Sequence, residues 1–343
     1  MTLSVNSSSD EMPQTVLITG ATGAVGPRVV RALHWAGYQI RTFSVDTPVL
    51  DMFPPQVEVI IGDVTDKNVV QSAMQGVSAV VHMAALLHVV NLSSGLREKC
   101  ERVNIGGTAT VVEAAIKEGV KRVVLFSTIA VYGSESGQVF DENSHTQPET
   151  YYAQTKLAAE EIVLNARRAD GEPIGTVLRL SAAYGSRIKG NYERMVRALA
   201  RNRFIPVGDG LNRRTLVYDK DVAIAAVLAV EHTAAAGRIY NVTDGNFHTL
   251  NEIILTICKA LGRKPPRFSL PVAPVRFAAG ILEDITQLCG CRSPITCATI
   301  DKYTEDIAVE SARIQKELGL VPQYDLNRGW RETIREMRER GAL

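Results

Sequence analysis

Three glycines follow directly on a short apolar segment near the start of the chain. In Thr15-Val-Leu-Ile-Thr-Gly-Ala-Thr-Gly-Ala-Val-Gly26 they are Gly20, Gly23 and Gly26. The apolar residues predict a strand, and the missing side chains let backbone amides of the next turn approach an anion. A helix beginning there directs its partly positive N-terminus at the same point. The segment therefore predicts a cradle for a dinucleotide pyrophosphate, although glycine-rich turns without such a ligand are common.

The overall composition is that of a globular protein. The 343 residues are 45% apolar and 22% charged, with a net charge of +1, and the length suggests about two domains. This balance gives no general attraction to nucleic acid or membranes. Apolar runs such as 223–230 are shorter than the roughly 20 residues that span a bilayer, so no membrane insertion is expected. Residues 1–14 lack a secretory signal and predict a flexible tail and a cytoplasmic location.

Five cysteines are an odd number in a long chain, so they form no plausible disulfide framework. Cys289, Cys291 and Cys297 could be considered as a metal site. However, the paired C-x-x-C spacing and a second group of ligands are missing. We therefore expect reduced, structural thiols and no metal.

Apolar β-branched segments alternate with helical patterns through the first half of the chain. Strands are expected at 16–18, 39–43, 57–61, 79–82, 122–126 and 174–180. Helices are expected between them at 28–35, 66–74, 101–117 and 151–168. This alternation predicts an α/β fold with a Rossmann-type doubly wound parallel sheet.

The regular alternation ends after Leu180. We assign 15–185 to a dinucleotide-binding domain, to which the strand and helix pattern of 214–244 returns. Residues 186–213 and 245–337 are assigned to a smaller, discontinuous C-terminal substrate domain.

A tyrosine and a lysine stand four residues apart in Tyr152-Ala-Gln-Thr-Lys156, hence on one face of the predicted helix. A phenol with a pKa of about 10 is a poor base unless a cation stabilises its phenolate. Lys156 can supply that cation, whereas Tyr151 has no lysine four residues on. The pair predicts catalysis, although such pairs also occur by chance on amphipathic helices.

Hydroxyl side chains end the predicted strand at 122–126. Ligands bind at the carboxyl ends of strands in an open parallel sheet, where Ser127 and Thr128 are expected. Either hydroxyl could hold a substrate oxygen beside Tyr152 or could cap a turn.

In these segments the chain resembles the extended short-chain dehydrogenase/reductases, the NAD-dependent epimerase/dehydratase group, over about residues 15–337. Besides the glycine loop and Tyr152 with Lys156, the family motifs are matched by Asp63-Val64, His82-Met-Ala-Ala85 and Asn104. The resemblance implies that NAD contacts Gly20, Thr22, Gly23, Ala24, Val25, Gly26, Asp63, Val64, Ala84, Ala85, Asn104, Tyr152 and Lys156. It also implies that Thr128, Tyr152 and Lys156 are catalytic.

One departure from the family constrains the reaction. Dehydratases of this group have an Asp-Glu pair after the catalytic hydroxyl, but this chain has Ile129 and Ala130. Apolar side chains cannot transfer protons. The sequence therefore favours oxidation, reduction or epimerisation at a carbinol carbon over dehydration.

The choice of cofactor depends on the end of the second strand. NAD enzymes place an acid about 20 residues beyond the glycines to hold the ribose hydroxyls. Ser44 ends the strand and Asp46 follows, while Arg41 lies within the strand. We expect NAD, held by Asp46, with NADP as an open alternative.

A second resemblance concerns the substrate. Arg214-Thr-Leu-Val-Tyr-Asp-Lys-Asp-Val-Ala223 is similar to the family segment whose arginine grips the diphosphate of a nucleotide sugar. A guanidinium suits phosphate because its planar fork donates two bonds. Arg213 is a second candidate and Asn191 a further ligand. A solvated arginine pair and a helix cap are the alternatives.

The sequence thus predicts an enzyme that exchanges hydride between NAD(P) and a sugar carbon, C4, of a nucleoside diphosphate sugar, as an epimerase or ketoreductase. A 3-hydroxysteroid or other alcohol dehydrogenase is an alternative, because 272–282 could line an apolar pocket. A non-catalytic dinucleotide sensor is another. The resemblance also implies a homodimer formed by the helices at 101–117 and 151–168.

Overall fold

The structure, a computed structural model, describes residues 14–343 except 88–93, 135–136, 289–290, 292 and 294–295. The predicted tail, up to residue 13, and Cys289 lie outside the described residues. The four described cysteines are unpaired, and no group of three or more metal-binding side chains occurs in the described part. None of the described helices combines the length and apolar character needed to cross a membrane.

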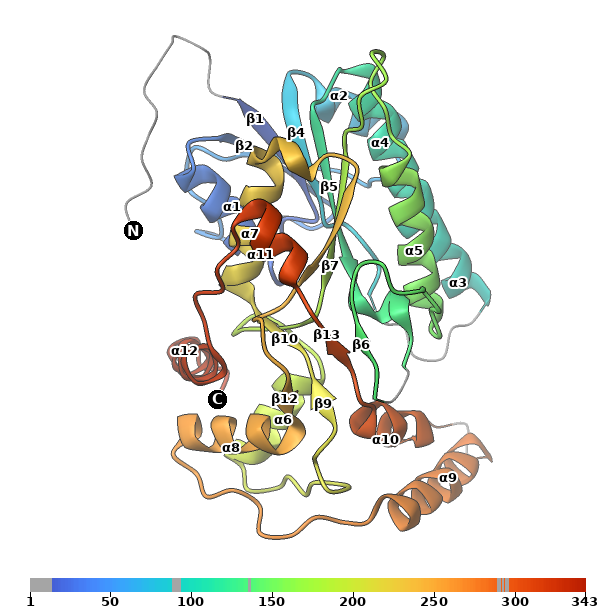
Figure 1. Ribbon diagram of the computed structural model, residues 1–343, viewed down its shortest axis with the longest axis vertical. Coiled ribbons are helices and arrows are strands. Elements are labelled where there is room, and N and C mark those ends of the chain that lie inside the picture. Colours follow the sequence, from blue (N-terminus) through green and yellow to red (C-terminus); the bar gives the residue numbers. More distant parts are fainter. Residues whose placement is uncertain (1–13, 88–93, 135–136, 289–290, 292, 294–295) are drawn as a thin grey trace.

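A seven-stranded parallel sheet forms the centre of the larger part of the molecule (Figure 1). The order across the sheet is β11 (Arg238–Val242), β7 (Gly175–Leu180), β5 (Arg122–Thr128), β4 (Val77–His82), β1 (Thr15–Thr19), β2 (Gln39–Ser44) and β3 (Glu58–Ile61). The chain reverses its direction across the sheet between β1 and β4, which confirms the doubly wound fold. Ligands of such sheets bind at this reversal.

Helices cover both faces of this sheet, as its buried strands require. One face carries α1 (Gly26–Trp35), α7 (Asp219–Glu231) and α11 (Ala312–Leu318). The other face carries α2 (Lys67–Met74), α4 (Gly107–Lys117) and α5 (Tyr151–Leu164). Three short helical segments connect these elements: a π-helical turn η1 (Arg102–Gly106), and the 3-10 turns η2 (Ile129–Tyr132) and η3 (Thr233–Ala235).

Two predicted helix limits were wrong. The helix expected at 101–117 begins earlier, with α3 (Ser94–Glu101), and reaches α4 through η1. The helix expected at 151–168 ends at Leu164, because Arg167 pairs with Pro173 in a tight turn. Neither change moves Tyr152 or Lys156 off the first turns of α5.

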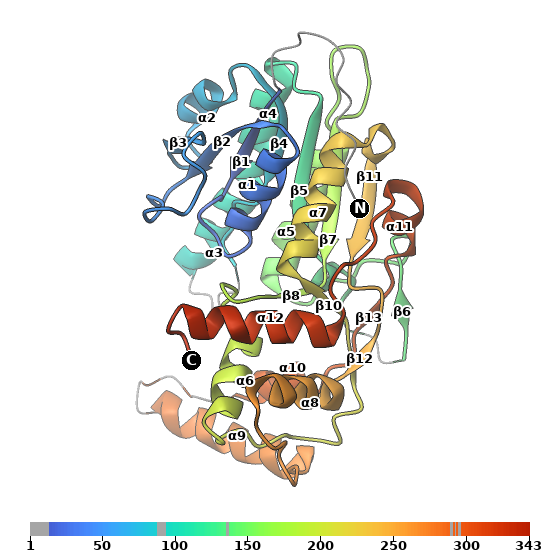
Figure 2. The same ribbon diagram turned by 90° about the vertical axis from the view of Figure 1, so that its left-hand side faces the viewer.

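A smaller part lies beyond the carboxyl edge of the sheet (Figure 2). Its helices are α6 (Asn191–Ala200), α8 (Leu250–Leu261), α9 (Val272–Leu288), α10 (Cys297–Thr304) and α12 (Leu326–Glu339). Three two-stranded pairs join it to the larger part: β8 (Ala182–Tyr184) with β10 (Leu216–Tyr218), β9 (Arg213–Arg214) with β12 (His248–Thr249), and β6 (Val139–Phe140) with β13 (Ala308–Val309).

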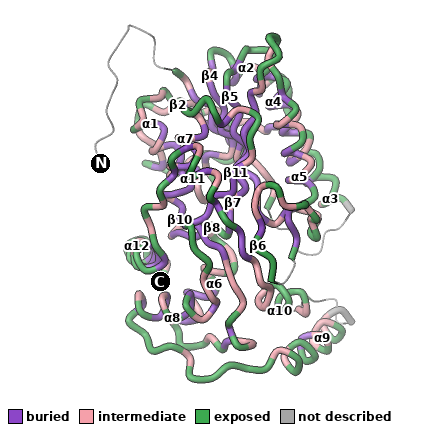
Figure 3. The backbone as a smooth tube through the Cα atoms, in the orientation of Figure 1, coloured by how far each residue is buried: buried purple, intermediate pink, exposed green. Residues whose placement is uncertain are grey.

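This smaller part has a core of its own between α6, α8 and α12. Trp330 on α12 stacks on Tyr184 of β8 with ring centroids 4.6 Å apart. By contrast, the connection from α8 to α9 and most of α9 are exposed (Figure 3). Helices α6, α8 and α12 are thus firmly packed together, whereas α9 forms an outer layer.

Candidate active site

The glycine loop lies between the end of β1 and the start of α1, at the carboxyl edge of the sheet. Gly20 has a φ of +69°, a left-handed conformation that favours glycine. A Cβ on Gly20 would lie 2.7 Å from the amide nitrogen of Ala84, and one on Gly26 would lie 1.9 Å from the carbonyl oxygen of Ala21. Side chains are therefore excluded at both glycines. The resulting cradle of bare backbone at a helix N-terminus is suited to a pyrophosphate.

The other predicted residues of this loop face the same edge. Thr22 donates its amide to the Ser44 hydroxyl at 3.3 Å, which ties the loop to the end of β2. Thr22, Ala24 and Val25 are partly exposed and Gly23 is exposed. The loop is thus accessible to a ligand, although Ala21 and Gly26 are buried.

Asp46, after β2, and Arg41, within β2, are the residues that bear on the choice between NAD, with a free ribose hydroxyl, and NADP, with a ribose phosphate. Asp46 is exposed in the turn that follows the strand. Arg41 forms an ion pair with Glu58 at 2.7 Å and donates to the carbonyl oxygens of Ala73 and Gln75. Because its guanidinium is held by these partners, Arg41 is not directed at a ribose phosphate.

Asp63 and Val64 follow β3, and Ala84 and Ala85 follow β4. The Asp63 carboxylate accepts bonds from the amide and hydroxyl of Thr65, both at 2.9 Å. Val64 is buried, while both alanines are partly exposed. Small and apolar side chains here leave room for a flat ring.

Asn104 connects the cofactor side of the site to the catalytic helix. It lies in η1, accepts from the amide of Leu86 at 2.8 Å and donates to the Leu86 carbonyl at 3.2 Å and to the Thr155 hydroxyl at 3.0 Å. The π-helical turn, which is frequent at functional sites, aims this side chain inward. Asn104 therefore fixes the position of α5 relative to the segment after β4.

His82 lies beneath this segment and was not assigned a role from the sequence. Its ring is fully buried between the hydroxyls of Thr19, at 2.7 Å, and Thr108, at 3.0 Å. Burial, together with the charge of Lys156, lowers the pKa of His82 to about 3. The ring is neutral at pH 7 and joins β1, β4 and α4. Only the tertiary structure reveals this, because the partners are far apart in sequence.

The two adjacent tyrosines at the start of α5, Tyr151 and Tyr152, have different surroundings. Tyr151 bonds to Glu101 and contacts Arg97 on α3, so it belongs to the surface. Tyr152 is partly buried, and burial raises the pKa of its phenol above the usual range. α5 packs against β5 and η2, the elements on either side of the Thr128 backbone. The structure therefore favours Tyr152 as the catalytic tyrosine.

Lys156 is only 2% exposed. Burial lowers the pKa of its ammonium group to about 8, and the negative charge of Glu160 opposes this. Glu160 is also buried and accepts bonds from Arg179 at 2.7 and 3.1 Å, as well as from Ser127. This buried network keeps a negative charge near Lys156. Its sequence signal was the spacing of Glu160 four residues after Lys156, on the same helix face.

Thr128 and Ser127 have different environments at the end of β5. The Ser127 hydroxyl is directed toward Glu160. The Thr128 oxygen accepts a bond from the Ala130 amide at 3.2 Å, which caps η2. A hydroxyl that accepts one bond can still donate another. Thr128 is therefore both a turn cap and a suitable donor to a substrate oxygen.

The predicted substrate arginines are held by acids and carbonyls. Arg213 pairs with Asp306 at 2.7 Å. Arg214 lies 3.5 Å from Glu305 and donates to the Tyr303 carbonyl, at the end of α10, at 2.9 Å. Both arginine side chains are mostly buried. Neither pair involves Tyr152 or Thr128.

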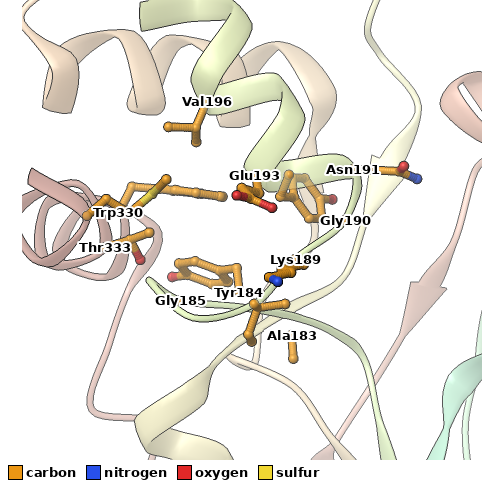
Figure 4. A pocket seen from close by; sticks show the side chains of 13 residues that line it. Ala183, Tyr184, Gly185, Lys189, Gly190, Asn191, Glu193, Val196, Trp330 and Thr333 are labelled. Carbon is orange, nitrogen blue, oxygen red and sulfur yellow. The ribbon is translucent and has the colours of Figure 1, made fainter. Parts of the chain in front are cut away.

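Asn191 begins α6 beside a cavity of about 70 Å³ (Figure 4). Its side chain points away from the other residues that line the cavity, among them Tyr184 and Trp330. Buried polar atoms of Tyr184, Trp330 and Thr333 have no partner among the described residues, so the cavity suits ordered water. It contains none of the predicted catalytic residues.

Similarity to known proteins shows the family of this chain. The model of the NAD dependent epimerase/dehydratase family matches residues 16–243. This chain belongs to that family, and it is therefore an enzyme. The match covers all seven strands of the sheet except Thr15, and all three predicted catalytic residues.

Individual relatives extend the similarity over the full chain. The N-acetyl-alpha-D-glucosaminyl-diphospho-ditrans,octacis-undecaprenol 4-epimerase of Escherichia coli O157:H7 is 27% identical over 94% of this chain and 95% of its own length. The UDP-glucose 4-epimerase of Vibrio cholerae is 28% identical over 94% and 95%. The solved structure of MoeE5 in complex with UDP-glucose and NAD superposes with a TM-score of 0.75 at 25% identity, covering 96% of this chain and 100% of its own.

Proposed function

We propose that this enzyme is an NAD-dependent epimerase or ketoreductase that transfers hydride at C4 of a nucleoside diphosphate sugar. The observation that carries the proposal is the position of Tyr152 and Lys156 on α5, beside the carboxyl end of β5 and at the same sheet edge as the glycine cradle. The two relatives named as 4-epimerases support the choice of carbon.

NAD suits the residues at this edge. The bare backbone of Gly20 and Gly26 would hold the pyrophosphate, Asp46 the ribose, and Asp63 with Val64 the adenine. Asn104, Ala84 and Ala85 would line the path toward α5. The partners of Arg41 support NAD over NADP, because its guanidinium is already held by Glu58 and two carbonyl oxygens.

Bound NAD supplies the hydride acceptor. Tyr152 removes the proton of the sugar hydroxyl, and the Lys156 charge opposes the effect of burial on the phenol by favouring the phenolate. Thr128 donates its O–H to the same substrate oxygen. The charge of buried Glu160 opposes the loss of the Lys156 proton, and neutral His82 joins β1 and α4 behind the site.

The residues after Thr128 argue against dehydration. Ile129 is buried and Ala130 carries no ionisable group. Elimination of water needs an acid and a base at the neighbouring carbons. We therefore propose that the reaction stops at oxidation, reduction or epimerisation.

Arg214 is proposed to bind the substrate diphosphate. Arg214 donates to the carbonyls of Lys302, at 2.5 Å, and Tyr303, at 2.9 Å, and lies 3.5 Å from Glu305. A diphosphate offers a stronger bidentate partner than these groups, so the guanidinium can exchange them for phosphate. Arg213 is held more firmly by Asp306, and Asn191 is a further proposed ligand at the start of α6.

The reaction can be tested by incubating the protein with UDP-glucose or UDP-N-acetylglucosamine. Inversion of C4 with only trace NAD would indicate an epimerase, whereas stoichiometric consumption of NADH with a keto sugar would indicate a reductase. Nuclear magnetic resonance of the sugar detects the inversion or the reduction, and absorbance measures the consumption of NADH. Oxidation of a 3-hydroxysteroid without turnover of any nucleotide sugar would instead support the alternative dehydrogenase.

The homodimer and the cytoplasmic location stay predictions. α4 and α5 lie side by side on one face of the sheet (Figure 1), where a second copy could form a four-helix interface. Light scattering coupled to size-exclusion chromatography would measure the molar mass directly.

A further inference from the structure

The outer face of α9 is apolar and has no partner within the described part of the chain. Phe277, Ile281 and Ile285 follow one another at four-residue intervals and are 72%, 46% and 52% exposed. Residues at this spacing share one face of a helix. An exposed apolar stripe on a helix is typical of a surface that binds another protein or a membrane.

The opposite face of α9 is already packed on α10. Ala279 is buried there, Arg276 pairs with Asp301 at 2.7 Å, and Glu283 accepts the amide of Cys297 at 2.7 Å. α9 therefore has a fixed orientation, and its apolar stripe points away from the rest of the molecule.

The segment leading into α9 is basic. Residues 262–282 contain four cations and no acid, although the chain as a whole is nearly neutral. Arg276 is neutralised by Asp301. Arg263, Lys264 and Arg267 are exposed and form no ion pair with any residue that the structure describes. Phe268, next to Arg267, is 68% exposed.

The apolar stripe and the exposed cations together indicate which kind of partner covers this surface. A second copy docked through the same surface in a two-fold dimer would bring the cations of both chains together, which is unfavourable. Exposed cations in the segment that leads into a helix with an apolar stripe match a bilayer, whose anionic headgroups lie next to its hydrocarbon.

We propose that the outer face of α9, with the basic segment 263–268, docks the enzyme onto an anionic phospholipid bilayer. The three large side chains enter the headgroup boundary, and Arg263, Lys264 and Arg267 contact lipid phosphates. α9 lies at the end of the molecule remote from the sheet (Figures 1 and 2), so docking leaves the cofactor cradle free. This binding does not depend on the reaction proposed above.

Docking is tested with the full chain and vesicles of phosphatidylcholine, either pure or with about a quarter phosphatidylglycerol. The protein should sediment with the anionic vesicles only, and added salt should release it. Phe277→Glu with Ile281→Glu should weaken binding at least about tenfold, and so should Lys264→Glu with Arg267→Glu.

Matched control variants introduce glutamate at exposed apolar and basic residues outside this surface. Trp35→Glu alters an 80% exposed aromatic residue on α1, and Lys121→Glu with Lys316→Glu removes two exposed cations outside this surface. Both should bind vesicles like the unchanged protein. Thermal unfolding and NAD titration check that each variant is folded, and Phe277→Ser replaces the glutamate variants if they unfold.

Two results would overturn the proposal. One is absence of binding to anionic vesicles, or binding that the α9 variants reduce no more than the controls do. The other is a change of molar mass in the Phe277→Glu, Ile281→Glu variant without a change in vesicle binding, which would show that another copy covers the stripe.

Discussion

The cofactor end and the substrate end of the site are built differently. At the cofactor end, bare backbone at Gly20 and Gly26 meets other backbone, and the polar groups behind it are buried. At the substrate end, Arg213 and Arg214 are held by Asp306, Glu305 and carbonyl oxygens. A backbone cradle has one geometry, whereas an arginine can exchange partners. We therefore expect substitutions to have larger effects on the cofactor and catalytic side.

The largest effect is expected for Tyr152→Phe, which removes the base. Turnover should fall about 10²–10⁴-fold, while NAD affinity, measured by fluorescence titration, stays near that of the unchanged enzyme. Tyr151→Phe is the matched control, because it removes only the surface contact with Glu101. An inactive Tyr151→Phe together with an active Tyr152→Phe would reverse the assignment.

Glu160→Gln breaks the buried pair with Arg179, whose side chains are 1% and 4% exposed. Losing one partner of a buried ion pair costs about 3–5 kcal/mol of the free energy of unfolding, measurable by urea denaturation. Glu113→Gln breaks the exposed pair with Lys67 and should leave stability unchanged within error. Equal effects of the two variants would contradict the role of burial.

Gly26→Ala tests the cradle itself. A methyl group 1.9 Å from the Ala21 carbonyl forces a backbone shift, which should cost about 1–3 kcal/mol of stability and weaken NAD binding. Gly95→Ala on α3, where the new Cβ meets nothing within 4 Å, is the control. If NAD binds Gly26→Ala normally, the loop does not hold the pyrophosphate.

Arg214→Gln addresses the substrate end. Losing charged hydrogen bonds to a diphosphate should raise KM about tenfold to a hundredfold with little change in kcat. Arg213→Gln should have a smaller effect on KM, because Asp306 already accepts hydrogen bonds from its Nε and Nη2 atoms. A larger KM change for Arg213→Gln would exchange the two roles.

The pH dependence of kcat tests the role of Lys156. Its pKa of about 8 means that the charge favouring the Tyr152 phenolate is present below this pH and is lost above it. We expect kcat to fall about tenfold between pH 7 and pH 9. Because Glu160 raises the pKa of Lys156, Glu160→Gln should move this fall to lower pH. An unchanged profile would show that Lys156 does not control the base.

Much of the fold was predictable because its signals are local. The glycine spacing, the alternation of strands and helices, and the four-residue step from Tyr152 to Lys156 all depend on neighbours in sequence. The limits of α5 and α4 were predicted wrongly because they depend on a turn at Arg167 and Pro173 and on the π-helical turn η1. Local helix propensity predicts neither the turn nor the π-helical segment.

The sequence by itself determined the nucleotide fold and the residue types of the catalytic pair, since glycine conformation and helical spacing are properties of a short segment. Only the tertiary structure decided which tyrosine faces inward, that Ser127 is directed toward Glu160, and that His82 is neutral between Thr19 and Thr108. These outcomes depend on burial and on partners distant in the chain, which exist only once the sheet has assembled.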